Sequence, residues 1–234
     1  RLKYSKHQDL WFKVLNLDKN HQQYLFMTLN CNGQLIDLNT PKVMGILNVT
    51  PDSFYDGGRF KDEKSILIQV EKLLSEGATF IDIGAYSSRP GADFVSEEEE
   101  LKRLIPIVNS VVKTFPESLI SIDSFRSRVI KTSVEAGAAM VNDISGGQLD
   151  PLMFEKVGAL GVPYIMMHMR GTPQTMQKMT DYSDVVKDVY TYFTERIQLA
   201  QTHQIKDIIL DLGFGFSKTI EQNFELLAMF DYYN

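Results

Sequence analysis

Polar residues follow a series of short apolar runs along this sequence, at the points where buried strands should end. Runs such as VMGILNV, FIDIGA and LISIDS are typical of strands buried on both faces. Because the carboxyl ends of consecutive parallel strands meet at one edge of a sheet, side chains there can form one ligand site. Carboxylates can accept paired hydrogen bonds from N–H donors, and amide oxygens can bind a hard cation. The strand-end residues are Asn48, Thr50, Gly84, Asp123, Asn142, Asp143, His168 and Asp211.

The elements that would position these residues form a repeating pattern. Strand-like runs alternate with helical stretches, among them 126–136, 182–202 and a last helix from about Thr219, which predicts parallel strands joined by crossover helices. About six strand–helix units can be counted. A (β/α)8 barrel and a doubly wound open sheet both fit, and because no Gly-rich dinucleotide fingerprint follows the first strand, the barrel is favoured. Strand-end Asp and Asn could instead cap the helices that follow.

The first 40 residues differ from the rest of the chain. Residues 1–22 are mixed and polar, whereas two alternating runs between Gln23 and Leu38 flank Cys31-Asn32-Gly33. The Asn-Gly pair is a strong signal for a β-hairpin turn. We therefore divide the chain into an N-terminal extension with a β-hairpin, residues 1–40, and a barrel domain, residues 41–234.

Bulk composition excludes several classes of protein. With 234 residues, 44% of them hydrophobic, the chain can form one sizeable core, and its formal charge of −6 with no dense Lys/Arg block argues against a nucleic-acid partner. A single cysteine, Cys31, excludes an intramolecular disulfide. No stretch approaches the roughly 18 apolar residues of a membrane span, so we expect no membrane partner and a cytoplasmic location.

Six motifs carry a resemblance to a known family. The loop string GILNVTPDSFYDGGRF, residues 45–60, is similar to the signature of dihydropteroate synthases. Five further segments agree in order and spacing: GAYSSRPGA, SIDSFR, VNDISGG, MMHMRGTPQTMQ and, with one change, DLGFGFSKT. The resemblance implies a (β/α)8 TIM barrel and a folate-biosynthesis transferase. Such an enzyme condenses 6-hydroxymethyl-7,8-dihydropterin pyrophosphate with p-aminobenzoate, by a dissociative route that needs no enzyme nucleophile.

The resemblance also implies roles for the strand-end residues. Asp211 matches the carboxylate that anchors the pterin, while Asp123 and Asn142 read the remaining ring edges and Phe216 packs against a substrate ring. Asn48 matches the residue that ligates Mg²⁺ on the pyrophosphate, which makes it both a metal ligand and a catalytic candidate.

Two long polar loops, 50–60 and 86–94, have the composition of mobile segments over a strand-end site. By resemblance they complete the p-aminobenzoate pocket. Phe54 would form an apolar wall and Asp56 a carboxylate near the developing cation, with Ser88 and Arg89 beside the anionic ligands. Asp56 and Arg89 are thus catalytic candidates together with Asn48.

Other conspicuous residues are interpreted as structural. A lone His such as His168 is more often a packed residue than a general base, and the methionines at 166, 167 and 169 read as core or pocket floor. Lys218 lies in a string whose spacing does not fit a phosphate-binding P-loop. The acidic run 97–100 after Ser96 predicts a capped helix with carboxylates in its first turn.

The sequence departs from the family pattern in three places. Leu212 replaces a usual Pro and Tyr86 a usual Glu. The motifs of the family's seventh and eighth strands are not found before Asn234, so we expect a barrel truncated after about six units, a natural protein that continues, and a fragment that is inactive alone. The alternatives are a methyltetrahydrofolate-dependent methyltransferase-like barrel and a non-catalytic pterin-binding fragment. Family resemblance further implies a homodimer and a sulfonamide target.

Overall fold

The parallel sheet predicted from the alternating pattern is present. The computed structural model describes residues 27–49, 59–86 and 95–233. Its strands and helices are β1 (Thr28–Cys31), β2 (Gln34–Asp37), β3 (Met44–Asn48), α2 (Arg59–Ser75), β4 (Phe80–Gly84), α3 (Glu97–Thr114), β5 (Leu119–Asp123), α4 (Ser127–Glu135), β6 (Met140–Asp143), α5 (Met153–Leu160), β7 (Tyr164–Met167), the 3-10 turn η1 (Met176–Lys178), α6 (Val185–Thr202), β8 (Ile208–Asp211), α7 (Ile220–Ala228) and the 3-10 turn η2 (Phe230–Tyr233).

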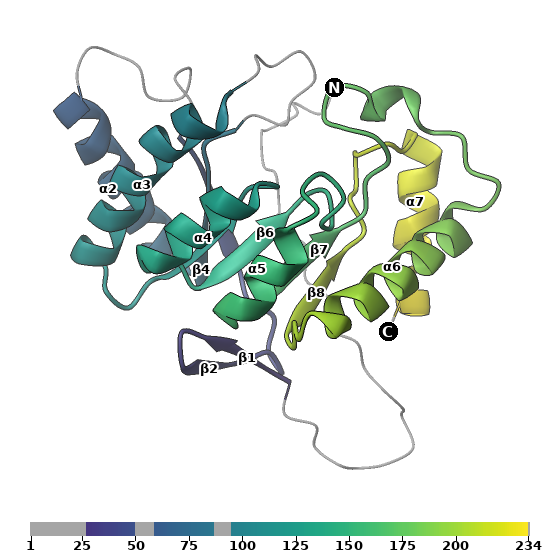
Figure 1. Ribbon diagram of the computed structural model, residues 1–234, viewed down its shortest axis with the longest axis horizontal. Coiled ribbons are helices and arrows are strands. Elements are labelled where there is room, and N and C mark those ends of the chain that lie inside the picture. The colour runs from purple at the N-terminus through teal and green to yellow at the C-terminus, as the bar shows by residue number, and fades with distance from the viewer. Residues whose placement is uncertain (1–26, 50–58, 87–94, 234) are drawn as a thin grey trace.

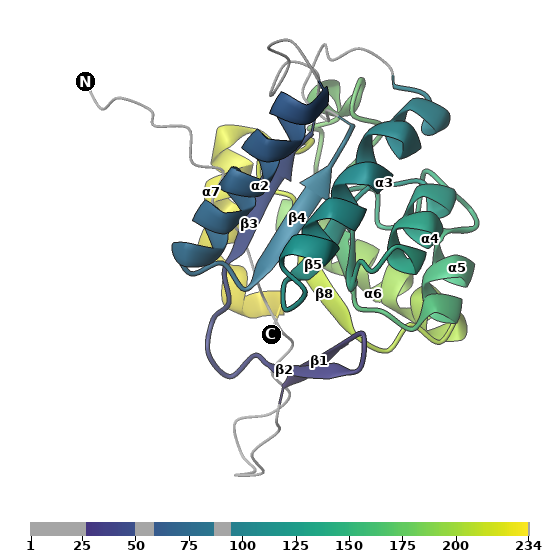
Figure 2. The same ribbon diagram turned by 90° about the vertical axis from the view of Figure 1, so that its left-hand side faces the viewer.

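Strand order decides between the two architectures left open by the sequence. Strands β3 to β8 lie side by side in the order of the chain, each parallel to the next. A doubly wound sheet reverses its strand order at a switch point, whereas a barrel does not. Figures 1 and 2 show helices α2 to α6 outside a curved sheet. The fold is therefore six β/α units of the (β/α) barrel type, as predicted.

The two faces of the sheet have different environments. Residues such as Ile81, Ile83, Ile120 and Ile122 point outward into the main hydrophobic core, where they pack against the helices. Residues of alternate register point inward, because successive side chains of a strand lie on opposite faces. The inward set contains most of the polar strand residues, so the interior can bind a ligand while the outer face stabilises the fold.

The predicted hairpin covers one end of this interior. Asn32 and Gly33 both have positive φ, 52° and 86°, as a two-residue hairpin turn requires. Leu29, Cys31 and Ile36 form a second core with residues at the beginnings of the strands, including Phe80. Figure 1 places the hairpin below the sheet, at the amino ends of its strands. Among the residues that the structure describes, the carboxyl ends of the strands are therefore the open end of the interior and the candidate place for a ligand.

Helix starts follow local capping signals. The helices predicted over 126–136 and 182–202 are α4 and α6, and α7 begins directly after Thr219, which forms a capping box with Gln222. Ser96 caps α3 through the N–H of Glu99, as expected for the acidic run that follows it.

Candidate active site

The predicted binding residues lie on one face of the sheet. Strand register aligns Asn48 with Gly84, Gly84 with Asp123, and Asp123 with Asn142, which forms a continuous row across β3 to β6. Asn142 then pairs with Ile165 of β7, and Met167, two residues further along the same face, pairs with Asp211 of β8. Asp123, Asn142 and Asp211 therefore project into the same interior at its carboxyl end.

Glycine at the centre of the row leaves room for a carboxylate. A Cβ atom added at Gly84 would lie 3.2 Å from Oδ2 of Asp123 and 3.3 Å from its Cβ. The Asp123 side chain thus lies across β4, above Gly84, rather than turning back over its own strand. A larger residue at position 84 would have to displace this carboxylate.

Carboxylates that project into the interior give it unusual electrostatics. Burial raises the pKa of Asp123 well above its usual value, and the nearby charges of Asp82, Glu100 and Asp143 raise it further. The pKa of Asp82 and that of Asp211 are also raised, again mainly by burial. Carboxylates held in such an environment are stabilised by N–H donors, so the site favours a ligand that supplies them.

Helix capping does not account for these strand-end residues. Among the described helix starts, those capped by a side chain are α3, α6 and α7, and the capping residues are Ser96, Asp184 and Thr219. The first N–H of α4 donates instead to Asp150, 2.7 Å away. Asp123, Asn142 and Asp211 are therefore available for a ligand.

Asp143 and His168 do not join the inward row. Asp143 is fully buried and accepts hydrogen bonds from the N–H and hydroxyl of Ser145, the N–H of Gly147 and the hydroxyl of Tyr164, at 2.7 to 2.8 Å. His168 is also buried, with its ring edge against Tyr192 of α6. Of the strand-end residues named from sequence, these two have structural contacts on the helix side.

A buried lysine donates hydrogen bonds to the glycine-rich turn after β8. Asp211 accepts a hydrogen bond from the N–H of Gly213 at 2.8 Å. Lys218 Nζ donates to the carbonyl oxygens of Gly213 and Phe216, both at 3.0 Å, and lies 3.0 Å from Nδ1 of His168. Burial lowers the pKa of His168 to about 2, so its neutral ring accepts from the lysine and is a weak base. Lys218 therefore positions the turn that carries Asp211 and Phe216.

Titration of Lys218 should appear in the pH dependence of stability. Burial lowers its pKa to about 7, whereas an unfolded lysine keeps its proton to about pH 10.4. Between these two pKa values the folded state binds fewer protons than the unfolded state. The free-energy cost of deprotonating Lys218 on folding therefore falls as pH rises. Between pH 7 and 9, the free energy of unfolding relative to Lys218→Met should rise by roughly 1.4 kcal/mol per pH unit. Urea denaturation at three pH values measures this difference, and a constant difference would contradict it.

An apolar wall stands next to the row. Ile144, Met167, Met169 and Met176 form a buried cluster, and Phe125, Leu149 and Phe216 pack against it. Phe216 is partly exposed, in the turn that follows Asp211. The methionines predicted as core or pocket floor are all buried. A flat ring held by the carboxylates would have an apolar surface beside it.

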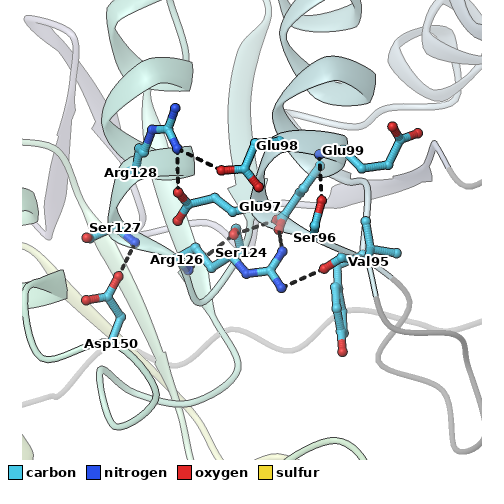
Figure 3. Close-up of polar contacts among 12 residues, drawn as sticks. Val95, Ser96, Glu97, Glu98, Glu99, Ser124, Arg126, Ser127, Arg128 and Asp150 are labelled. Atoms are coloured by element: carbon cyan, nitrogen blue, oxygen red, sulfur yellow. Dashed lines mark hydrogen bonds and ion pairs between the residues drawn. The ribbon is translucent and has the colours of Figure 1, made fainter.

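Four predicted loop residues, Phe54, Asp56, Ser88 and Arg89, lie outside the described residues. Arg126 donates to the carbonyl of Val95 at 2.7 Å (Figure 3). Its guanidinium carbon also lies 5.3 Å from the ring centre of Tyr86, so it contacts both flanks of the second loop. Tyr86 is buried, and its hydroxyl accepts from Gln174 at 2.8 Å. An aromatic side chain thus takes a packed position where the family usually has Glu. The other departure, Leu212, is buried in the main core.

Two residues of this region were not predicted from the sequence. Asp82 lies in the middle of β4, between Ile81 and Ile83. It is therefore not one of the strand-end residues from which the site was predicted. Glu100 was interpreted only as a helix-dipole residue, yet it is 1% exposed and pairs with Arg126. For Asp82 the signal was a charge between two buried isoleucines, and for Glu100 it was the helical spacing that places it on the same face as Leu104 and Val108.

Within the described ranges 27–49, 59–86 and 95–233, no helix is long and apolar enough to cross a membrane.

Comparison with known proteins agrees with the motifs. The family model described as pterin binding enzyme matches residues 44–233. The dihydropteroate synthase of Haemophilus influenzae is 44% identical over 203 residues, which are 86% of this chain and 73% of that protein. The chain belongs to the dihydropteroate synthase family of pterin-binding enzymes.

Two further relatives show how much of their length this chain matches. The folic acid synthesis protein fol1 of Pneumocystis carinii is 49% identical over 192 residues, covering 81% of this chain but 26% of that protein. The solved structure of the Xanthomonas albilineans dihydropteroate synthase with 4-aminobenzoic acid superposes with a TM-score of 0.80 at 38% identity. This match covers 88% of the present chain and 73% of that one. The six β/α units thus correspond to part of a dihydropteroate synthase barrel.

Proposed function

We propose that the protein is a dihydropteroate synthase, which joins 6-hydroxymethyl-7,8-dihydropterin pyrophosphate to p-aminobenzoate and releases pyrophosphate. The observation that carries the proposal is the row of inward polar residues at the carboxyl ends of consecutive strands. Asp123, Asn142 and Asp211 offer acceptors to the N–H groups along the edge of a pterin. Family membership and the 4-aminobenzoic acid bound in the Xanthomonas enzyme support the choice of substrates.

Each described residue has a specific task in this proposal. Asp211, at the end of β8, accepts hydrogen bonds from the N–H edge of the pterin, and the Lys218-supported turn fixes its orientation. Asp123 and Asn142, neighbours in register, contact the remaining polar edges. Phe216 and the methionine cluster cover the apolar side of the bound ring. Excluding water from this pocket strengthens all of these hydrogen bonds.

A magnesium ion fits the position of Asn48. This residue ends β3 in the same row as Gly84 and Asp123, and it is partly exposed at the mouth of the interior. Mg²⁺ prefers oxygen ligands and usually keeps waters and substrate phosphates, so one amide oxygen from the protein is compatible with it. The ion would supply positive charge to the departing pyrophosphate. Asn48 would hold it beside the ring carried by Asp123 and Asn142.

Replacement of Asn48 should separate turnover from pterin binding. In Asn48→Ala, we expect the Mg²⁺ concentration for half-maximal turnover to rise about tenfold, the usual size of a damaged metal site. The Kd of the pterin without pyrophosphate should change little, because Asn48 faces the leaving group. Steady-state assays at graded Mg²⁺ measure this, with Asn109→Ala on the exposed face of α3 as control. An unchanged Mg²⁺ requirement would remove Asn48 from the metal site.

Product formation tests the proposed activity itself. The natural full-length protein, incubated with the pterin pyrophosphate, p-aminobenzoate and Mg²⁺, should release dihydropteroate and pyrophosphate in equal amounts. Pterin binding without product formation would contradict the proposal and favour a non-catalytic pterin-binding protein. A cytoplasmic location and a homodimeric assembly remain predictions, which cell fractionation and sedimentation would test.

A further inference from the structure

Asp82 is an unusual residue for its position. It occupies the centre of β4, where its neighbours Ile81 and Ile83 are fully buried, and it is itself 4% exposed. Its register partners are Ile46 on β3 and Ser121 on β5, one layer deeper than the row of Gly84 and Asp123. A carboxylate in such a place is costly unless its oxygens are paired. Its presence therefore needs a specific explanation.

Asp82 contacts the polar residues of two neighbouring strands. Oδ2 accepts a hydrogen bond from Nδ2 of Asn142 at 2.9 Å. Oδ1 is buried, and the hydroxyl of the register neighbour Ser121 lies close enough to act as a hydrogen-bond donor that lowers the pKa of Asp82. The bond to Asn142 connects this deep carboxylate to the row above it, which points to a functional role at the floor of the pocket.

The hydrogen bond to Asp82 determines how Asn142 faces a ligand. An ionised carboxylate only accepts hydrogen bonds, so the amide nitrogen of Asn142 must turn toward it. The amide oxygen is then directed away from the deeper layer, toward the carboxyl-end opening where Asn142 is partly exposed. Without Asp82 the amide could rotate and present its nitrogen, a donor, to the donor groups of the ring.

We propose that Asp82 is a positioning residue, which holds Asn142 with its amide oxygen toward the N–H edge of the bound pterin. This inference rests on the proposed function and adds to it a residue beneath the substrate-contacting row. Asp82 acts through Asn142 rather than on the reacting atoms. Its raised pKa, which comes mainly from burial, agrees with a group kept at a cost to stability.

Two substitutions separate positioning from structural support. Asp82→Ala removes the acceptor and should raise the KM for the pterin pyrophosphate about tenfold, a typical cost of one misdirected hydrogen bond. Asp82→Asn keeps an acceptor but can also donate, so it should raise this KM by only about threefold. The KM for p-aminobenzoate at saturating pterin should not change in either variant. Asp82→Asn should melt at the same or a higher temperature than the wild type, because a buried charge is removed.

Asp143→Asn is the matched control. Asp143 is also a fully buried carboxylate, but it lies on the opposite face of β6 from Asn142, and both of its oxygens are paired. It should show the reverse pattern, with a lower melting temperature and an unchanged pterin KM. If Asp82→Asn instead followed Asp143→Asn in both measurements, Asp82 would be a structural residue and the inference would be wrong.

A double-mutant cycle tests whether Asp82 works through Asn142. In an Asn142→Ala background, Asp82→Ala should have no additional effect on the pterin Kd measured by calorimetry with the full-length protein. Additive effects would show that Asp82 contacts the ligand independently and would overturn the positioning role. If the wild type bound no pterin, the proposed function would be wrong. If Asp82→Ala bound pterin normally, only the positioning role of Asp82 would be wrong.

Discussion

Asp211→Asn is expected to weaken pterin binding roughly 100-fold, about 2.7 kcal/mol. The Asp211 carboxylate can accept two charge-assisted hydrogen bonds from the ring edge, and the amide replaces one acceptor with a donor that faces another donor. Asp211 already accepts from the N–H of Gly213, so the amide would also disturb the turn. Calorimetric titration of the full-length protein with the pterin pyrophosphate measures the loss.

Titration of Asp211 should make pterin binding depend on pH. Burial raises the pKa of Asp211, and protonation removes its charge and one acceptor. Pterin affinity of the wild type should therefore fall with acidification, starting above the usual carboxyl range, whereas Asp211→Asn should lack this component. Asp207→Asn is the matched control, because Asp207 precedes β8 at its other end and accepts from the N–H of Asn30 in the hairpin. Equal affinities of the Asp211→Asn and Asp207→Asn proteins would contradict the assignment.

Glu100→Ala is expected to lower the free energy of unfolding by about 3 to 5 kcal/mol, the range for breaking one side of a buried ion pair. Glu100 is 1% exposed at the start of α3, where it accepts from the hydroxyl of Ser124 at 2.7 Å and pairs with Arg126 of the next β/α unit. Its removal takes one carboxylate contact from a largely buried guanidinium. Urea denaturation followed by circular dichroism gives the change.

Two neighbouring variants show whether burial causes this effect. Glu98 pairs with Arg128 on the surface, where their side chains are 73% and 59% exposed (Figure 3). Glu98→Ala should therefore change stability by less than about 1 kcal/mol. The double variant Glu100→Leu/Arg126→Met should be more stable than Glu100→Ala alone, because neither charge remains buried. Equal losses in Glu98→Ala and Glu100→Ala would contradict the account.

Strand order and the inward row were predictable because their signals are local. Alternating apolar runs and helices gave the parallel sheet, and the Asn32-Gly33 pair gave the hairpin turn. The polar residue after each run located Asn48, Asp123, Asn142 and Asp211 without knowledge of the tertiary structure. Whether these residues contact substrate stays a prediction, but the register places them on one face.

The contacts beneath the row were not predictable from local patterns. Asp82 and Asn142 are 60 positions apart, and Lys218 lies 50 positions after His168. Each pairing depends on which strands are neighbours and on how far each is shifted along the next. The sequence marks such residues only as charges in places that should be buried, and it does not identify their partners. Asp143 shows the reverse error. Its position at the end of a strand suggested that it belongs to the site, but its side chain faces the helices.

A crystal structure of the full-length protein with a bound pterin tests the central claim most directly. We expect the ring to lie in the interior of the barrel, with its N–H edge within hydrogen-bonding distance of the Asp211 carboxylate and its other polar edges against Asp123 and Asn142. A pterin bound elsewhere, with these three side chains making no contact to it, would contradict the account.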